Sequence, residues 1–278
     1  MNTVAAPPPS TDEIAAEVLA VLDRRGQLEP ISARPSGLDL ASAYEVAAAV
    51  RRQREQRGER MIGRKIGFTN TTIWAEYGVG APIWGYVYDT TFRTLADLDG
   101  RFDISALIEP RIEPEIVFRL CRTPEPVMDE RALLSCVEWV AHGFEIVQSI
   151  FPGWRFTAAD TVAAFGLHGA LLVGPQVAVR PETAADWYDA LAGFEISLTR
   201  DGEAADHGRA SNVLSGGPLT ALRHLVEVLA ADPASPPLAS GEIITTGTVT
   251  RAFPITAGET WSTKFKGLKL PGATVHFV

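Results

Sequence analysis

The feature that most constrains this chain is a change in its apolar pattern near Met61. From Met61 onward, short runs of β-branched and aromatic residues are separated by glycine and proline, which is typical of many short strands joined by turns. Before Met61, apolar residues instead recur at helical spacing. The sequence therefore predicts an α+β fold, with a helical N-terminal segment over residues 1–60 and a β-rich core over residues 61–278 in a single structural domain.

The expected helices are marked by capping residues and by apolar residues on one face. The first begins at Ser10, which has capping-box spacing to Glu13, and the second begins near Asp39. Further helical patterns interrupt the strands at about residues 129–140, 183–192 and 218–230.

The expected strands are short and rich in β-branched and aromatic residues. The clearest of them cover residues 83–88, 115–120, 144–149 and 194–199. The last runs into Asp201-Gly202, a dipeptide that favours a tight β-hairpin turn. We therefore expect a hairpin at that point.

Charge and composition narrow the possible partners. The chain has 25 Lys+Arg and 34 Asp+Glu, a net charge of −9, which argues against nucleic-acid binding. Residues 163–179 form an apolar stretch broken by glycine and proline, so no membrane span is expected. Residues 1–10 lack the pattern of a signal peptide, and Cys121 and Cys136 have no disulfide or zinc spacing. A cytoplasmic location is expected.

Two glutamates, Glu113 and Glu115, are separated by one residue at the start of an apolar run. On a strand they would share one face, with Cα atoms about 7 Å apart. Such carboxylates repel one another unless a cation lies between them, and they suit a hard divalent ion such as Mg²⁺ or Mn²⁺. The polar face of a half-exposed strand has the same spacing, so spacing alone leaves both interpretations open.

Glu145 and Lys65 are charged residues in apolar or glycine-rich surroundings. Glu145 enters an apolar run, where a lone carboxylate would be costly to bury. Three carboxylates on one divalent ion leave room for two oxygens of a chelating acid and a water. Lys65 lies between Gly63 and Gly67, where a cation could approach a ligand and act as an acid or base. A plain surface loop is the alternative interpretation of Lys65.

Several short motifs occur in a characteristic order between about Leu38 and Phe277. They are Gly-Arg-Lys-Ile-Gly-Phe-Thr at 63–69, Tyr-Gly-Val at 77–79, Pro-Ile-Trp-Gly at 82–85, Arg-Ile-Glu-Pro-Glu-Ile at 111–116, Phe-Glu-Ile-Val at 144–147, Asp-Thr-Val-Ala at 160–163 and Gly-Glu-Ile-Ile-Thr-Thr-Gly-Thr at 241–248. In order and spacing the chain resembles the 2-keto-4-pentenoate hydratase and 4-oxalocrotonate decarboxylase group of the fumarylacetoacetate hydrolase superfamily.

This resemblance implies a rolled, mixed β-sheet with flanking helices, and a homo-oligomer of two or more subunits. It also implies a small 2-oxo acid substrate that chelates a Mg²⁺ or Mn²⁺ ion, which stabilises enolate charge as a Lewis acid. The implied residues are the metal ligands Glu113, Glu115 and Glu145, the catalytic Lys65 near the substrate, and Thr246, Gly247 and Thr248 lining the pocket.

The chain departs from the group at two places. Hydratases of the group have an acidic residue where Ile83 precedes Trp84-Gly85, and this version resembles the decarboxylases. After residues 160–163 many members continue with Asp-Asn and a small hydroxyl residue, whereas the polar residue here is His168. We expect His168 to supply the missing proton transfer as a catalytic residue. A structural histidine at the edge of a strand is the alternative.

The expected function is that of a metal-dependent lyase of aromatic catabolism acting on a small 2-oxo acid. Hydration of a 2-hydroxydienoate or 2-keto-4-pentenoate-type substrate through a metal-stabilised enolate is the first choice. Decarboxylation of a 4-oxalocrotonate-type acid is the second, and Ile83 favours it. A carbon–carbon hydrolase is a third possibility. A catalytically weak 2-oxo-acid binding protein is the alternative from a different class.

Overall fold

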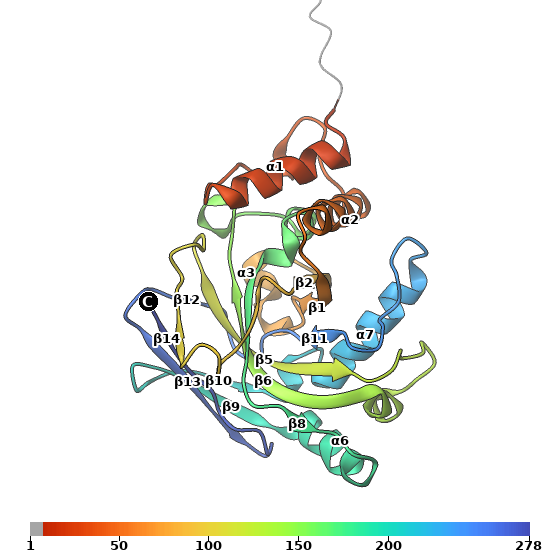
Figure 1. The fold of residues 1–278 in the computed structure, drawn as a ribbon, viewed down its shortest axis with the longest axis vertical. Coiled ribbons are helices and arrows are strands. Elements are labelled where there is room, and N and C mark those ends of the chain that lie inside the picture. The colour runs from red at the N-terminus through yellow and green to blue at the C-terminus, as the bar shows by residue number, and fades with distance from the viewer. Residues whose placement is uncertain (1–7) are drawn as a thin grey trace, which may run out of the picture.

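The computed structural model describes residues 8–278, apart from the side chains of residues 76 and 77 (Figure 1). The predicted lack of a signal peptide rests mainly on residues 1–7 and lies outside the described residues. The helices are α1 (Thr11–Asp23), α2 (Leu40–Gln56), α3 (Trp74–Tyr77), α4 (Glu130–Leu133), α5 (Ala158–Ala163), α6 (Ala184–Gly193) and α7 (Pro218–Ala231).

The strands alternate with these helices from Met61 onward. They are β1 (Met61–Gly67), β2 (Ile83–Tyr88), β3 (Phe92–Thr94), β4 (Arg101–Phe102), β5 (Arg111–Leu120), β6 (Val137–Val147), β7 (His168–Val173), β8 (Val177–Ala178), β9 (Glu195–Arg200), β10 (Glu203–Arg209), β11 (Ile243–Thr245), β12 (Phe253–Pro254), β13 (Thr260–Lys266) and β14 (Thr274–Phe277).

The larger sheet has nine strands, with β5 and β6 near its centre. Its order is β2-β1-β11-β5-β6-β7-β3, with β12 paired to β5 and β8 paired to β6. The β1–β11 and β3–β7 pairs are parallel and the β5–β6 pair is antiparallel, so the sheet is mixed. The predicted α+β fold with a mixed sheet is confirmed.

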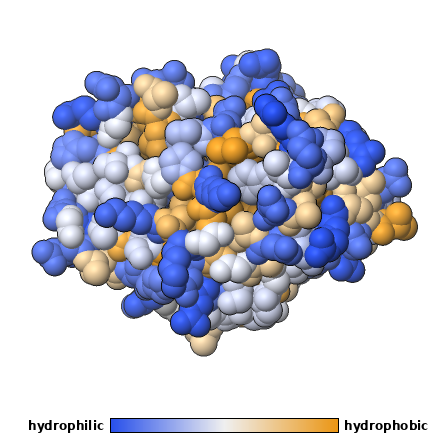
Figure 2. Space-filling view, turned by 90° about the horizontal axis from the view of Figure 1, so that it is seen from below, coloured by the Kyte–Doolittle hydropathy of each residue, from blue (hydrophilic) through white to orange (hydrophobic). Residues whose placement is uncertain are grey.

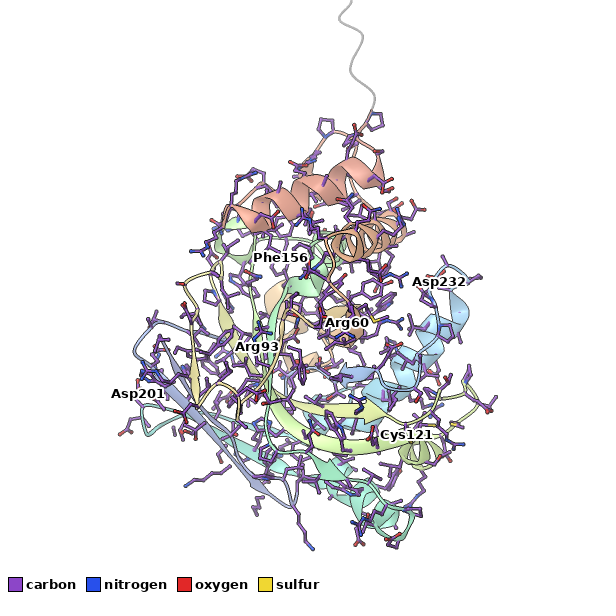
Figure 3. All side chains as sticks on the ribbon, in the orientation of Figure 1. Arg60, Arg93, Cys121, Phe156, Asp201 and Asp232 are labelled. Carbon is purple, nitrogen blue, oxygen red and sulfur yellow. The ribbon has the colours of Figure 1, made fainter. Side chains whose placement is uncertain are left out.

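The smaller sheet has five strands in the order β10-β9-β13-β14-β4. Its β9–β10 hairpin turns at Asp201 and Gly202, whose φ angles are 52° and 87°. Positive φ at both turn positions matches the twist of a two-residue hairpin, so the predicted hairpin is confirmed. Figure 3 labels Asp201 at the tip of this hairpin. Ile112 and Phe144 of the larger sheet share an apolar core with Trp261 of the smaller one.

The N-terminal helices lie above the larger sheet in Figure 1, with α1 outermost. Ser10 and Glu13 form the predicted capping box, in which the Ser10 N–H donates to Glu13 Oε2 over 2.8 Å. Helices α1 and α2 share an apolar cluster with α5 and Ile83, and Phe156 packs against that cluster below them (Figure 3). The division of the chain at residue 60 therefore stays a prediction, because this cluster includes residues from both sides of it.

The prediction of a helix at residues 129–140 is wrong for residues 134–140. Helix α4 ends at Leu133, a 3₁₀ turn covers Leu134–Cys136, and strand β6 begins at Val137. The spacing of Leu133, Leu134, Val137 and Val140 imitates a helical face, but the β-branched valines suit the buried centre of a sheet. The strand expected at residues 144–149 corresponds in part to β6, which ends at Val147, two residues before the predicted end.

Hydrophilic side chains are interspersed with small apolar patches on the face shown in Figure 2. Within residues 8–278, no helix combines the length and the apolar character needed to cross a bilayer.

Candidate active site

Three glutamates meet on neighbouring strands of the larger sheet. Glu113 and Glu115 are two apart on β5 and point to one face, while Glu145 on β6 lies directly opposite Glu113 in the antiparallel ladder. One carboxylate oxygen from each of the three lies within 4.8 Å of the others. Glu115 and Glu145 are buried, whereas Glu113 is partly exposed. The structure thus brings together the three predicted ligands.

Lys65 on β1 points into this cluster. Its Nζ lies 3.4 Å from Glu145 Oε2 and donates to the Gly166 carbonyl over 2.9 Å, and the side chain is 3% exposed. Burial alone would lower the pKa of Lys65, but the three glutamates outweigh it and raise the pKa. Lys65 is therefore a charged ammonium group at neutral pH. Lys65 also lines the cavity beside the cluster.

The cluster holds more negative charge than Lys65 neutralises. Burial and the neighbouring Glu145 raise the pKa of Glu113 to about 7. Burial and the neighbouring Glu145 and Glu113 raise the pKa of Glu115. Burial would also raise the pKa of Glu145, but the Lys65 ammonium and a His168 hydrogen bond lower it to about 2. Two carboxylates thus resist ionisation where no further cation neutralises them.

Two carboxylate oxygens in the cluster have no hydrogen-bond partner among the described residues. They are Glu115 Oε1 and Glu145 Oε2, and both are buried. A buried carboxylate oxygen without a donor is costly, and a hard divalent cation accepts oxygen ligands of this kind. The three glutamates therefore fit a divalent metal ion.

The turn after β11 orients Glu115. The Gly247 N–H donates to Glu115 Oε2 over 2.7 Å, while the Thr248 hydroxyl donates to the Thr250 carbonyl over 3.0 Å. Gly247 and Thr248 line the cavity, as predicted by position. The prediction for Thr246 is not matched, because the buried Thr246 hydroxyl donates to the Ile116 carbonyl over 2.9 Å and the residue does not line the cavity.

His168, the predicted acid or base, lies behind Glu145. Its Nδ1 is 2.7 Å from Glu145 Oε1 and its Nε2 is 2.8 Å from the Thr91 hydroxyl. Burial lowers the pKa of His168, and the residue does not line the cavity. Both ring nitrogens are therefore engaged away from the space where a substrate would bind, which does not support direct proton transfer by His168.

A small cavity of about 30 Å³ lies beside the cluster. Lys65 and Glu113 are the ionisable residues among the side chains that line it. The apolar lining residues are Phe68, Ile73, Ile83, Val147, Trp154 and Leu167. The lining places one charged end against an apolar remainder.

Sequence reasoning missed two residues of the site, Gly166 and Thr91. Gly166 holds Lys65 through its carbonyl, at the centre of three successive residues, Phe165, Gly166 and Leu167, with φ of 63°, 61° and 63°. Positive φ is unfavourable for non-glycine residues and is concentrated at functional sites. The glycine was the one visible signal, since no local pattern connects Thr91 to His168.

Proteins similar to this chain are hydratases and decarboxylases. It is 30% identical over 245 residues to 2-hydroxyhexa-2,4-dienoate hydratase of Comamonas testosteroni, a match that covers 87% of this chain and 88% of the relative. It is 29% identical over 233 residues to 4-oxalocrotonate decarboxylase of Pseudomonas sp. (strain CF600), covering 83% of each.

Solved structures share the fold. The 4-oxalocrotonate decarboxylase from Pseudomonas putida G7, complexed with magnesium and adipate, matches with a TM-score of 0.85 and 23% identity over 96% of this chain and 97% of that one. Further structures with this fold are described as fumarylacetoacetate hydrolase family proteins. No protein-family model matches the chain. From its identity to these relatives across most of both chains, the protein belongs to the 2-keto-4-pentenoate hydratase and 4-oxalocrotonate decarboxylase group, and it is a lyase with the fold of fumarylacetoacetate hydrolase family structures.

Proposed function

We propose that this lyase depends on a divalent metal ion and acts on a small 2-oxo acid. The observation that carries the proposal is the cluster of Glu113, Glu115 and Glu145, in which two buried oxygens lack partners beside the Lys65 ammonium. A relative's structure with magnesium supports a divalent ion, and the all-oxygen donor set suits Mg²⁺ or Mn²⁺.

A bound Mg²⁺ or Mn²⁺ would supply a Lewis acid that stabilises negative charge developing on the substrate. The chain's own residues do the rest. The Gly247 N–H holds Glu115 Oε2 and leaves Oε1 without a hydrogen-bond partner. Lys65, fixed by Gly166 and Glu145, presents a positively charged N–H to the cavity, where it can bind an anionic group or donate a proton from Nζ.

The cavity favours decarboxylation over hydration. Hydration requires a group that activates water as well as one that donates a proton, whereas loss of carbon dioxide requires stabilised charge and one proton donor. Ile83 lines the cavity at the position where, by the family resemblance, hydratases carry an acid, so Lys65 is the proton donor and that acid is not available to activate water. The apolar surroundings also favour the departure of a carboxylate as neutral carbon dioxide.

Hydration remains the second candidate because a specific observation favours it. The hydratase of Comamonas testosteroni is 30% identical to this chain over 87% of its length. Glu113 lines the cavity, and its carboxylate could accept a proton from water.

The test is to supply 4-oxalocrotonate and 2-hydroxypenta-2,4-dienoate separately, with Mg²⁺ or with EDTA. Loss of the conjugated absorbance and release of carbon dioxide are recorded together. Metal-dependent gas release from the first acid is expected. Absorbance loss on the second acid without gas would establish hydration instead. If a panel of 2-oxo acids gives neither absorbance loss nor carbon dioxide, the lyase proposal is overturned in favour of a binding protein.

We also propose that the protein is a cytoplasmic homo-oligomer. The family resemblance supports the assembly, and Cys121 and Cys136 are both free thiols, which suits a reducing compartment. Light scattering on the purified protein tests the assembly, and a monomer would contradict it.

A further inference from the structure

We propose that His168 is a positioning residue that selects which oxygen of Glu145 faces the metal ion. It holds Oε1 and leaves Oε2 free, so that Glu145 binds the ion through one oxygen. This inference rests on the proposed metal site, and it gives His168 a role other than the proton transfer expected from the sequence.

The contacts divide the two oxygens of Glu145 sharply. Oε1 lies 2.7 Å from His168 Nδ1, a strong hydrogen bond between side chains that are 1% and 0% exposed. Oε2 has no hydrogen-bond partner among the described residues and lies 3.4 Å from Lys65 Nζ. One carboxylate oxygen of Glu145 lies within 4.8 Å of an oxygen of Glu113 and of an oxygen of Glu115.

The proton positions follow from what each group can do. An ionised Glu145 only accepts hydrogen bonds, so Nδ1 of His168 donates to Oε1. Nε2 lies 2.8 Å from the Thr91 hydroxyl, which also donates to the Tyr88 carbonyl over 3.0 Å. Thr91 is itself fixed, because its carbonyl accepts the Leu171 N–H over 2.9 Å. His168 is thus held between Thr91 in the β2–β3 turn and Glu145 on β6, and it fixes the orientation of the Glu145 carboxylate.

The His168–Glu145 hydrogen bond opposes a closer ion pair between Glu145 and Lys65. Without His168, Glu145 could rotate and bring both oxygens toward the Lys65 ammonium, which is already 3.4 Å from Oε2. In a closer ion pair, the Lys65 ammonium would neutralise the Glu145 carboxylate and hydrogen-bond its oxygens. Glu145 would then bind the metal ion less well. Groups that orient metal ligands from behind change metal affinity by about 10- to 100-fold when they are removed.

The experiment measures Mn²⁺ binding by calorimetry in the full chain, with melting of the metal-free protein recorded alongside. His168→Leu is expected to weaken Mn²⁺ binding by about 10- to 100-fold. His168→Asn can place an amide N–H where Nδ1 lies and is expected to recover most of that loss. His276→Leu is the matched control, because His276 bonds Thr260 in the smaller sheet, and it should leave Mn²⁺ affinity unchanged.

The outcomes separate this inference from the metal site itself. If the wild-type chain binds no Mn²⁺, the proposed function fails. If the wild type binds and His168→Leu keeps its affinity within about twofold, or if His168→Asn is no better than His168→Leu, the positioning role is wrong. Should His168→Leu not fold, Thr91→Val, which removes the hydroxyl that holds Nε2, must weaken Mn²⁺ binding in the same direction.

Discussion

Gly247 donates its backbone N–H to Oε2 of Glu115 over 2.7 Å at a position that admits no side chain. Its φ is 90°, and a Cβ there would lie 1.8 Å from the Thr69 hydroxyl oxygen. The turn and the carboxylate are therefore fixed relative to each other by the backbone. This makes the turn as important to the site as the glutamate that it holds.

Gly247→Ala is expected to destabilise the protein more than Gly241→Ala. Gly241 has nearly the same φ, 88°, but a Cβ there would lie 3.9 Å from its nearest neighbour, so this variant measures the cost of φ alone, about 1–2 kcal/mol. The clash at Gly247 adds about 1–3 kcal/mol. Urea unfolding of both variants gives the two free energies, and equal losses would show that the contact with Thr69 is easily relieved.

Glu115→Gln is expected to weaken Mn²⁺ binding by at least about 10-fold and to lower turnover by about 100-fold or more, because the amide cannot replace a charged ligand. Calorimetry and steady-state rates measure the two effects. Glu138→Gln is the control, since Glu138 is an exposed acid on β6 that pairs with Arg119. Full metal-dependent turnover in Glu115→Gln would place the metal elsewhere.

Ile83→Asp is expected to raise the ratio of hydrated product to carbon dioxide. An acid at this cavity position would supply the missing group for water activation, with an effect on the order of 100-fold, the low end for positioned acid–base catalysis. Ile83→Asn has a similar size without the charge and serves as the control. The same product ratio in both variants would mean that Ile83 does not separate the two reactions.

In the metal-free protein, the contribution of Glu113 to stability is expected to be lost as the pH rises from about 4.5 to about 7. The pKa of Glu113 is raised by burial from 4.5 to about 7, so its stabilising effect is complete below the lower value and is lost above the higher one. The partly exposed position limits the change to about 1–3 kcal/mol. Urea unfolding at several pH values, with and without Mn²⁺, measures it.

Glu113→Gln provides the comparison for that pH dependence. Burial lowers the pKa of His142 to about 4, which makes the protein less stable as the pH falls from 6.5 toward 4, and both proteins share this opposite effect. The difference between wild type and Glu113→Gln therefore removes the His142 effect and reports Glu113 together with its coupling to Glu115 and Glu145. Parallel stability curves would contradict the raised pKa.

Local sequence was sufficient for features that depend on neighbours in the chain. The capping box at Ser10, the Asp201-Gly202 hairpin and the shared face of Glu113 and Glu115 follow from spacing alone. Glu145 was predicted as a third site residue from the cost of burying a lone carboxylate and from the family resemblance. The β5–β6 register shows how the chain brings it opposite Glu113.

Features that depend on distant contacts could not be predicted. Val137 and Val140 fit a helical face as well as a strand, and the pairing with β5 decides between them. His168 was correctly singled out as unusual, but its direction is set by Thr91, 77 positions away. The positive φ of Phe165 and Leu167 has no local signature, because ordinary side chains at those positions normally avoid it.

The β5–β6 ladder places Glu113 directly opposite Glu145, a like-charge pair that works against the association of its own strands. Any cation that binds between them removes this repulsion and stabilises the folded state according to the ratio of its free concentration to its dissociation constant. The availability of the ion in the surroundings would then help to set how often the sheet opens, and so how long each molecule survives proteolysis.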